Sequence, residues 1–162
     1  MQRSEFTFFH PLRVRWAEVD RQDVVFNGHY FLYFDVAVAE YWRAIGFRYP
    51  QDLVDKFGTD IYAVKASAEY HGSATYDELL DIGCRAARLG RSSLQLVLGI
   101  WRGADHLTSG ELIYVNADVK TRKSAPWPEV VRQAILRYER VPPEVLAKRL
   151  QRRLHLGAEL SL

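Results

Sequence analysis

The chain has 162 residues, of which 48% are hydrophobic and 13% aromatic, enough for one domain with a core and too many for a largely disordered chain. Its 22 basic and 20 acidic residues give a formal net charge of +2, which is too small to indicate a nucleic-acid-binding protein. Cys84 is the single cysteine, so an intramolecular disulfide is excluded, and a buried, unreactive thiol is predicted. The first residues lack the apolar segment of a signal peptide. We therefore expect a cytoplasmic protein that binds neither nucleic acid nor membrane.

The first predicted elements are a strand and a long helix. Residues 6–17 alternate apolar and charged positions, which predicts the strand. The helix is predicted over residues 28–45, with Asn27 as its N-cap and Gly46 just beyond its end. It is apolar nearly all round, so it needs cover from other elements on several sides. It is also too short and too interrupted by charge to span a bilayer.

Four more strands are predicted after a short helix that begins near Pro50. They cover about residues 61–71, 80–89, 93–101 and 106–120. In the first of them, one apolar face is predicted to hold Tyr62, Val64, Ala66, Ala68 and Tyr70. The last of them is apolar on both faces in its middle, which is typical of a strand near a subunit interface.

Two helices that begin with proline are predicted after the sheet, over residues 128–140 and 143–154, in a tail that is rich in arginine and lysine. The order of elements predicts an α+β domain, because a five-stranded antiparallel sheet wrapped round the central helix covers that helix with apolar strand faces. We divide the chain into this domain, residues 1–124, and a C-terminal helical extension of the same domain, residues 125–162.

Asp20 is the first candidate for chemistry. It lies seven residues before Asn27, so the intervening turn can fold its carboxylate back toward the backbone amides of Gly28 and His29 at the helix N-terminus. Amides of this kind suit an oxyanion, and a nearby carboxylate can act as a general base or a nucleophile on an acyl carbonyl. The alternative is that Asp20 only fixes the turn by accepting from local amides.

The segment from Asp20 to Tyr30, DRQDVVFNGHY, resembles the Asp-x-x-Gly-(Val/His)-Val-(Tyr/Asn)-x-x-x-Tyr signature of hotdog-fold acyl-CoA thioesterases, in particular the 4-hydroxybenzoyl-CoA thioesterase family. Residues 68–79 contain AEY and ATYDEL, which are similar to that family's turn between two strands. GRSSL at residues 90–94 is similar to its strand opening. The resemblance covers roughly residues 10–122, and the helical tail lies outside it.

The resemblance implies a hotdog fold that assembles as a homodimer or homotetramer and hydrolyses acyl-CoA without a metal or bound cofactor. It implies that Asp20 is the nucleophile or general base and that the region from Asn27 through Gly28 to His29 polarises the thioester carbonyl. The family has glycine where this chain has Asp23, which places an extra carboxylate in the turn.

The resemblance also makes Arg91 and Ser92 candidates for binding the CoA phosphates, because arginine donates paired hydrogen bonds to phosphate. The sequence has no G-x-S-x-G nucleophile motif and no histidine or cysteine spacing typical of a metal site. Two alternatives stay open. The chain could be a non-catalytic module that binds acyl-CoA or acyl-carrier protein, or its basic tail could bind an anionic partner.

Overall fold

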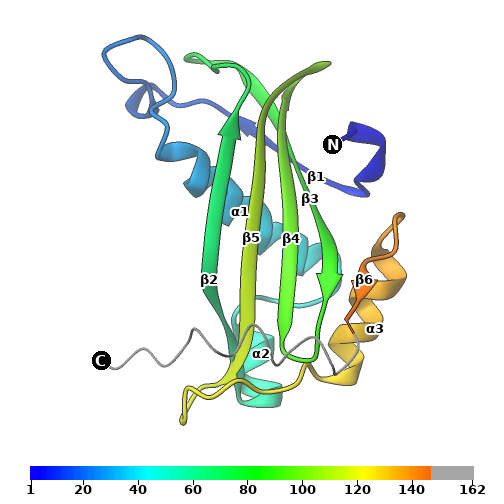
Figure 1. The fold of residues 1–162 in the computed structure, drawn as a ribbon. Helices are drawn as coiled ribbons and strands as arrows, with labels where there is room; N and C mark the ends of the chain where they lie inside the picture. The colour runs from blue at the N-terminus through cyan, green and yellow to red at the C-terminus, as the bar shows by residue number, and fades with distance from the viewer. Residues whose placement is uncertain (147–162) are drawn as a thin grey trace.

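The computed structural model describes residues 1–146, which form a curved antiparallel sheet with one long helix against its inner face (Figure 1). In chain order the elements are η1 (Arg3–Glu5), β1 (Phe8–Arg13), η2 (Trp16–Glu18), α1 (His29–Ala44), α2 (Gln51–Phe57), β2 (Thr59–Tyr70), β3 (Leu79–Leu89), β4 (Ser93–Arg102), β5 (Asp105–Asp118), α3 (Glu129–Tyr138) and β6 (Glu144–Val145). The strand order is β1-β3-β4-β5-β2, and all of these neighbours are antiparallel. The predicted five-stranded sheet round a central helix is confirmed.

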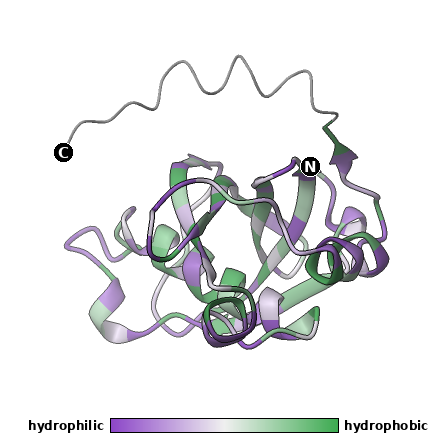
Figure 2. Ribbon diagram, turned by 90° about the horizontal axis from the view of Figure 1, so that it is seen from below, coloured by the Kyte–Doolittle hydropathy of each residue, from purple (hydrophilic) through white to green (hydrophobic). Residues whose placement is uncertain are grey.

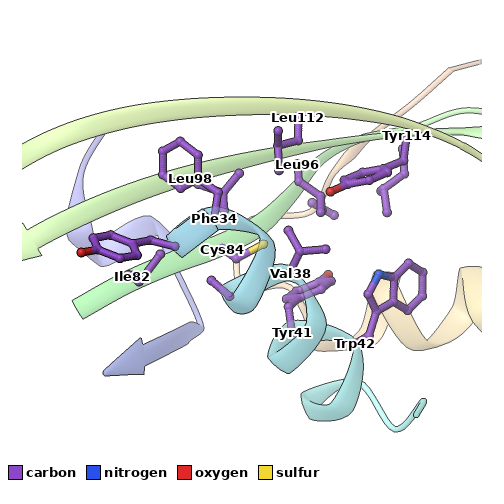
Figure 3. Close-up of a cluster of buried hydrophobic side chains, with 14 of the residues drawn as sticks. Phe34, Val38, Tyr41, Trp42, Ile82, Cys84, Leu96, Leu98, Leu112 and Tyr114 are labelled. Atoms are coloured by element: carbon purple, nitrogen blue, oxygen red, sulfur yellow. The ribbon is translucent and has the colours of Figure 1, made fainter. Parts of the chain in front are cut away.

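Helix α1 is enclosed because apolar side chains occupy most of its circumference. Five of its side chains, Tyr33, Phe34, Ala37, Tyr41 and Trp42, are fully buried. Figure 3 shows α1 packed beneath strands that contribute Leu96, Leu98 and Leu112 to the same core. Seen from below, the sheet and α1 form two layers (Figure 2). The predicted helix over residues 28–45 is confirmed to within one residue at each end.

The ring of Phe34 in α1 lies directly against Gly110 of β5, so the helix is very close to the sheet at this point. A Cβ atom at position 110 would lie 2.5 Å from two ring carbons of Phe34, which is too close for any real contact. Glycine in this strand therefore lets the helix lie against the sheet.

The prediction for the apolar face of β2 is wrong over the first half of that strand. A β-bulge at Val64 shifts the pairing with β5 between Ala63 and Lys65. Because a one-residue shift exchanges the two faces of a strand, Ile61 is buried against the core, whereas Tyr62 lies on the outer face of the sheet. Beyond the bulge the prediction holds, since Ala68 packs against the core.

The C-terminal segment follows the prediction in its first half only. The predicted helix over residues 128–140 is confirmed as α3, which buries Val131 and Ile135 completely. The next predicted helix, over residues 143–154, is wrong at its start, because residues 144–145 form the short strand β6, parallel to the end of β3. The part of that predicted helix from residue 147 onward lies outside the described residues. None of the helices within residues 1–146 is long and apolar enough to cross a membrane.

A buried carboxyl group joins α3 to the core. Glu139 is only 7% exposed, and its Oε1 accepts hydrogen bonds from the Tyr41 hydroxyl at 2.6 Å and the Ala86 amide at 2.7 Å. Its Oε2 is buried without a partner among the described residues. Burial raises the pKa of Glu139, although the hydrogen bonds from Tyr41 and Ala86 oppose this shift. Cys84 lies nearby, and the prediction of a buried cysteine is confirmed.

The raised pKa of Glu139 predicts a pH-dependent stability. An acid whose pKa is higher in the folded state contributes stability that is fully present below the unfolded pKa and is lost as pH rises through the folded pKa. The Glu139→Gln variant keeps an acceptor but cannot ionise. The melting temperature of the variant minus that of wild type should therefore increase as pH rises from about 4 to neutrality. Thermal denaturation across this range measures the difference. The matched control is Glu129→Gln on the exposed start of α3. If the difference in melting temperature from wild type is independent of pH for both variants, the prediction is contradicted.

Candidate functional site

Asp20 lies on a tight hairpin between η2 and α1. The hairpin is held by a bridge between Val19 and Val25 and by the Asp20 amide, which donates to the Val24 carbonyl at 2.8 Å. The Phe26 amide donates to the Glu18 carbonyl at 3.0 Å and closes its base. The Val25 amide donates to the Ala74 carbonyl at 2.9 Å, which also ties the hairpin to the loop between β2 and β3.

The Asp20 side chain is half-buried and borders a cavity of about 340 Å³. Its Oδ1 accepts from the Gln22 amide at 2.7 Å, which is the local turn contact that the sequence left as an alternative. Its Oδ2 accepts no hydrogen bond from the described residues. The carboxylate can therefore support the turn with one oxygen and present the other to a ligand. The cavity is lined by Asp20, Gln22, Val24, Val25, Phe26, Asn27, Tyr30, Tyr70, Gly72 and Ser73.

Asn27 and Tyr30, on either side of the start of α1, line the same cavity, whereas the predicted site residues Gly28 and His29 are not part of its lining. The prediction of Asn27 as N-cap is wrong, because Gly28 is the N-cap residue and no side chain caps this end. The His29 amide donates to the Phe26 carbonyl at 2.9 Å, whereas the amides of Asn27 and Gly28 donate to no acceptor within residues 1–146. Uncapped amides at a helix start carry a partial positive charge. They form a ready binding point for an anionic oxygen.

Two tyrosines to which the sequence analysis gave no role in the site, Tyr30 and Tyr70, set the position of this helix start. The Tyr70 hydroxyl, from the end of β2, donates to the Asn27 carbonyl at 3.0 Å. The Tyr30 hydroxyl accepts from the Ala74 amide at 3.1 Å, and the two tyrosine rings pack edge to face with centroids 5.3 Å apart. Tyr30 stands in the motif itself, but the contact of Tyr70 joins distant parts of the chain and leaves no local signal.

Asp23, which stands where the resembled family has glycine, adopts a left-handed backbone conformation with φ of 59°. Aspartate is one of the few residues other than glycine that tolerate this region, so the turn keeps its shape. Asp23 is exposed and does not line the cavity beside Asp20. The second carboxylate of the turn is therefore a conformational feature of the hairpin.

Arg91 and Ser92, the candidate phosphate-binding pair, lie apart from this cavity, at the turn between β3 and β4. Ser92 lines a groove of about 990 Å³, whereas Arg91 is exposed outside it. The groove lies on the outer face of the sheet, since the side chains of Ile113 and Val115 point away from α1. It is lined by Tyr62, Val64, Lys65, Arg88, Ser92, Ser93, Gln95, Ile113, Val115, Ala117, Arg122, Lys123, Ser124 and Leu146.

Two cations of this groove were missed by the sequence analysis. Arg122 and Lys123 follow β5 in a turn that is held by the Asp118 carboxylate. The Arg122 guanidinium lies over the Tyr62 ring, with its Cζ atom 5.1 Å from the ring centroid. Neither forms an ion pair with a described acidic residue, whereas Lys65 is paired with Glu111. The only local signal is the basic run KTRK at residues 120–123. Among residues 1–146, no three His, Cys, Asp or Glu side chains gather closely enough to hold a metal ion.

A comparison with protein families finds a match over residues 22–109, more than half of the chain, to the model described as the thioesterase superfamily. The chain belongs to the thioesterase superfamily. The matched segment contains α1, Arg91 and Ser92, and it begins two residues after Asp20. The narrower assignment to the 4-hydroxybenzoyl-CoA thioesterases stays a prediction.

One curated relative of this thioesterase-superfamily chain is a protein from Aquifex aeolicus (strain VF5) that is provisionally named an esterase. The two are 30% identical over 84 residues, which is 52% of this chain. The matching part spans 64% of that relative's own length.

Solved structures confirm the hotdog fold. A 1,4-dihydroxy-2-naphthoyl-CoA thioesterase from Synechocystis has a TM-score of 0.73 and 18% identity, covering 79% of this chain and 94% of its own. A thioesterase from Thermus thermophilus, solved with coenzyme A and Zn, has a TM-score of 0.72 and 22% identity, covering 85% of this chain and 98% of its own. A gentisyl-coenzyme A thioesterase has a TM-score of 0.70 and 22% identity, covering 79% and 98%. At these identities the likeness shows the fold alone.

Proposed function

We propose that the protein hydrolyses acyl-CoA thioesters at the cavity beside Asp20. One observation carries the proposal: Asp20, which has an uncommitted carboxylate oxygen, and Asn27, whose free amide lies just before the uncapped start of α1, line one cavity. Membership of the thioesterase superfamily supports the reaction class. The neighbours named for CoA thioesters support the substrate class by analogy of fold.

Asp20 can act in either of two ways. As a general base it takes a proton from water, whose oxygen attacks the thioester carbonyl. As a nucleophile it attacks the carbonyl itself, and water then hydrolyses the resulting anhydride. In both routes the carbonyl oxygen becomes negative, and its collapse breaks the carbon–sulfur bond and releases CoA as a thiolate. The thiolate takes its proton from protonated Asp20 in the general-base route and from water in the nucleophilic route. The free amides of Asn27 and Gly28 are the donors that we assign to this oxyanion, with His29 beside them at the start of α1.

For the CoA phosphates we propose Arg91 and Ser92 together with Arg122 and Lys123 of the outer groove. Ser92 and the two cations line one groove whose described lining contains no acidic residue. Its apolar floor and the Tyr62 ring suit an aromatic base, and its unpaired cations suit phosphate.

We propose that the protein assembles as a homodimer through β2. This strand is the end of the sheet, and residues 63–66 are exposed along it, which leaves a free edge for pairing. Antiparallel pairing of two β2 edges would bring the Tyr62 end of one protomer beside the partner's Tyr70 end, which borders the Asp20 cavity. A homotetramer would form if two such dimers covered the outer face. Light scattering tests the association directly, because a monomer would contradict it.

Replacing Asp20 tests the chemistry. Asp20→Asn removes the base or nucleophile but can keep the turn contact to Gln22, so we expect turnover to fall by about 10² to 10⁴ with an unchanged melting temperature. Thiol release from short-chain, long-chain and aromatic acyl-CoAs measures turnover, and the same panel identifies the acyl group. Asp23→Asn and Asp23→Gly are the matched controls in the same hairpin, and we expect both to keep wild-type turnover.

Unchanged hydrolysis in the Asp20→Asn variant would overturn the proposed chemistry. If wild type binds acyl-CoA and releases no thiol, the chain is instead a non-catalytic acyl-CoA or acyl-carrier-protein binding module. The departure from the family at Asp23 gives that alternative little support, since the aspartate takes the backbone conformation of a glycine.

Removing Arg122 of the groove or Arg91 beside it tests the phosphate assignment. Arg122→Ala and Arg91→Ala should each raise KM for acyl-CoA about 10- to 100-fold and leave kcat unchanged, because a charge-assisted hydrogen bond contributes roughly 1.5–3 kcal/mol. A thioester of N-acetylcysteamine lacks the phosphates, so its KM should be the same in the variants and in wild type. The control is Arg137→Ala on α3, which should affect neither substrate. A rise in KM for both substrates would show that these arginines do not bind phosphate.

A further inference from the structure

Glu18 is a buried carboxylate directly beneath the hairpin that carries Asp20. It is 4% exposed, although it stands two residues before Asp20 in a segment that is otherwise largely exposed. An acidic side chain is rarely buried to this degree unless it is fully paired. The surroundings of Glu18 supply this pairing, and they connect the hairpin to α1.

Each of the two carboxylate oxygens of Glu18 accepts two hydrogen bonds. Oε2 accepts from the Arg15 amide at 2.7 Å and from the Tyr33 hydroxyl of α1 at 2.8 Å. Oε1 accepts from Nε of Arg15 at 2.6 Å and also from its Nη2. Burial alone would raise the pKa of Glu18, but the hydrogen bonds from Arg15 and Tyr33 outweigh it and hold this pKa below its ordinary value. The group is therefore a carboxylate that depends on these donors.

The same residue closes the hairpin through its backbone. Its carbonyl accepts from the Phe26 amide, so Glu18 and Phe26 form the base from which Asp20 projects. Tyr33 is fully buried and lies one helical turn after His29, close to the uncapped start of α1. Glu18 thus contacts both the hairpin that holds the Asp20 carboxylate and the helix whose uncapped start lies between the cavity residues Asn27 and Tyr30.

We propose that Glu18 is a positioning residue for hydrolysis: through Tyr33 and Arg15 it locks the hairpin against α1 and so fixes Asp20 relative to the amides of Asn27 and Gly28. The proposal rests on the proposed function, because it assigns Glu18 to the geometry of that reaction. Its effect is on the chemical step, since a displacement of about 1 Å at a reacting group can lower the rate a hundredfold.

The chain offers a matched control in Asp52 of α2. Asp52 is also 4% exposed and also accepts from the amide and guanidinium of an arginine nearby in sequence, Arg48. It borders neither the cavity nor the groove. Asp52→Asn therefore reproduces the loss of a buried, arginine-bound carboxylate without touching the hairpin.

The first experiment compares kcat, KM and melting temperature for Glu18→Gln, Tyr33→Phe and Asp52→Asn. In either orientation the NH2 group of the glutamine would face an N–H of Arg15, which can only donate, so the lock should loosen. We expect kcat to fall about 10- to 100-fold for Glu18→Gln and less for Tyr33→Phe, with KM within about threefold of wild type. Asp52→Asn should keep wild-type kcat even if its melting temperature falls as much as that of Glu18→Gln. Tyr33→Phe removes only one hydroxyl, so this variant tests the positioning role if Glu18→Gln does not fold.

The second experiment adds Glu18→Gln to Asp20→Asn. A residue that acts through Asp20 has nothing left to position, so the double variant should be no more than about twofold slower than Asp20→Asn alone. A further loss equal to that of the single Glu18→Gln variant would overturn the positioning role. It would leave the proposed function standing, because that function fails only if Asp20→Asn keeps its activity.

Hydrogen exchange gives a readout that does not need turnover. In Glu18→Gln, the amides of Asp20, Val25 and Phe26 should exchange faster than in wild type, while exchange in β3, β4 and β5 stays the same. Unchanged exchange of the hairpin amides would overturn the proposal whether or not the protein hydrolyses acyl-CoA.

Discussion

The contact of Phe34 with Gly110 determines how closely the central helix can lie against the sheet, and the rest of the structure depends on that distance. Because no side chain intervenes at Gly110, α1 lies deep in the concave face and buries aromatic residues on several sides. The start of this helix is consequently held at one end of the sheet. Asn27 and Tyr30 beside this uncapped start line one cavity with Tyr70 at the end of β2 and with Asp20 of the hairpin.

A helix start without a cap has a cost, since polar amides are left without partners. Tyr70 of β2 holds this start through the Asn27 carbonyl, and Tyr30, in the first turn of α1, ties it to the Ala74 amide. Glu18 holds the facing hairpin from beneath. The arrangement leaves amides free where an anionic oxygen can replace the missing cap, so the local cost is offset when a ligand binds.

The sequence predicted the elements whose signals are local. The 3.6-residue pattern placed α1 to within a residue, and alternation placed the strands. What it missed depends on contacts between distant residues. The bulge at Val64 has no marker in the chain, yet it turns Tyr62 to the outer face. Residues 144–145 pair with the end of β3, which a proline-led helix pattern does not reveal. The sequence predicts Glu18 as an exposed turn residue, because its contact with Tyr33 is visible only in the structure.

The central claim is that Asp20 acts on a thioester whose carbonyl oxygen is held by the start of α1. The most direct test is the rate of thioester cleavage with enzyme in excess over an acyl-CoA that it binds, measured for wild type and Asp20→Asn, since a single turnover excludes product release from the rate. The account predicts that the cleavage rate falls by about two orders of magnitude or more while the dissociation constant of the acyl-CoA is unchanged. Equal cleavage rates in the two proteins would contradict it.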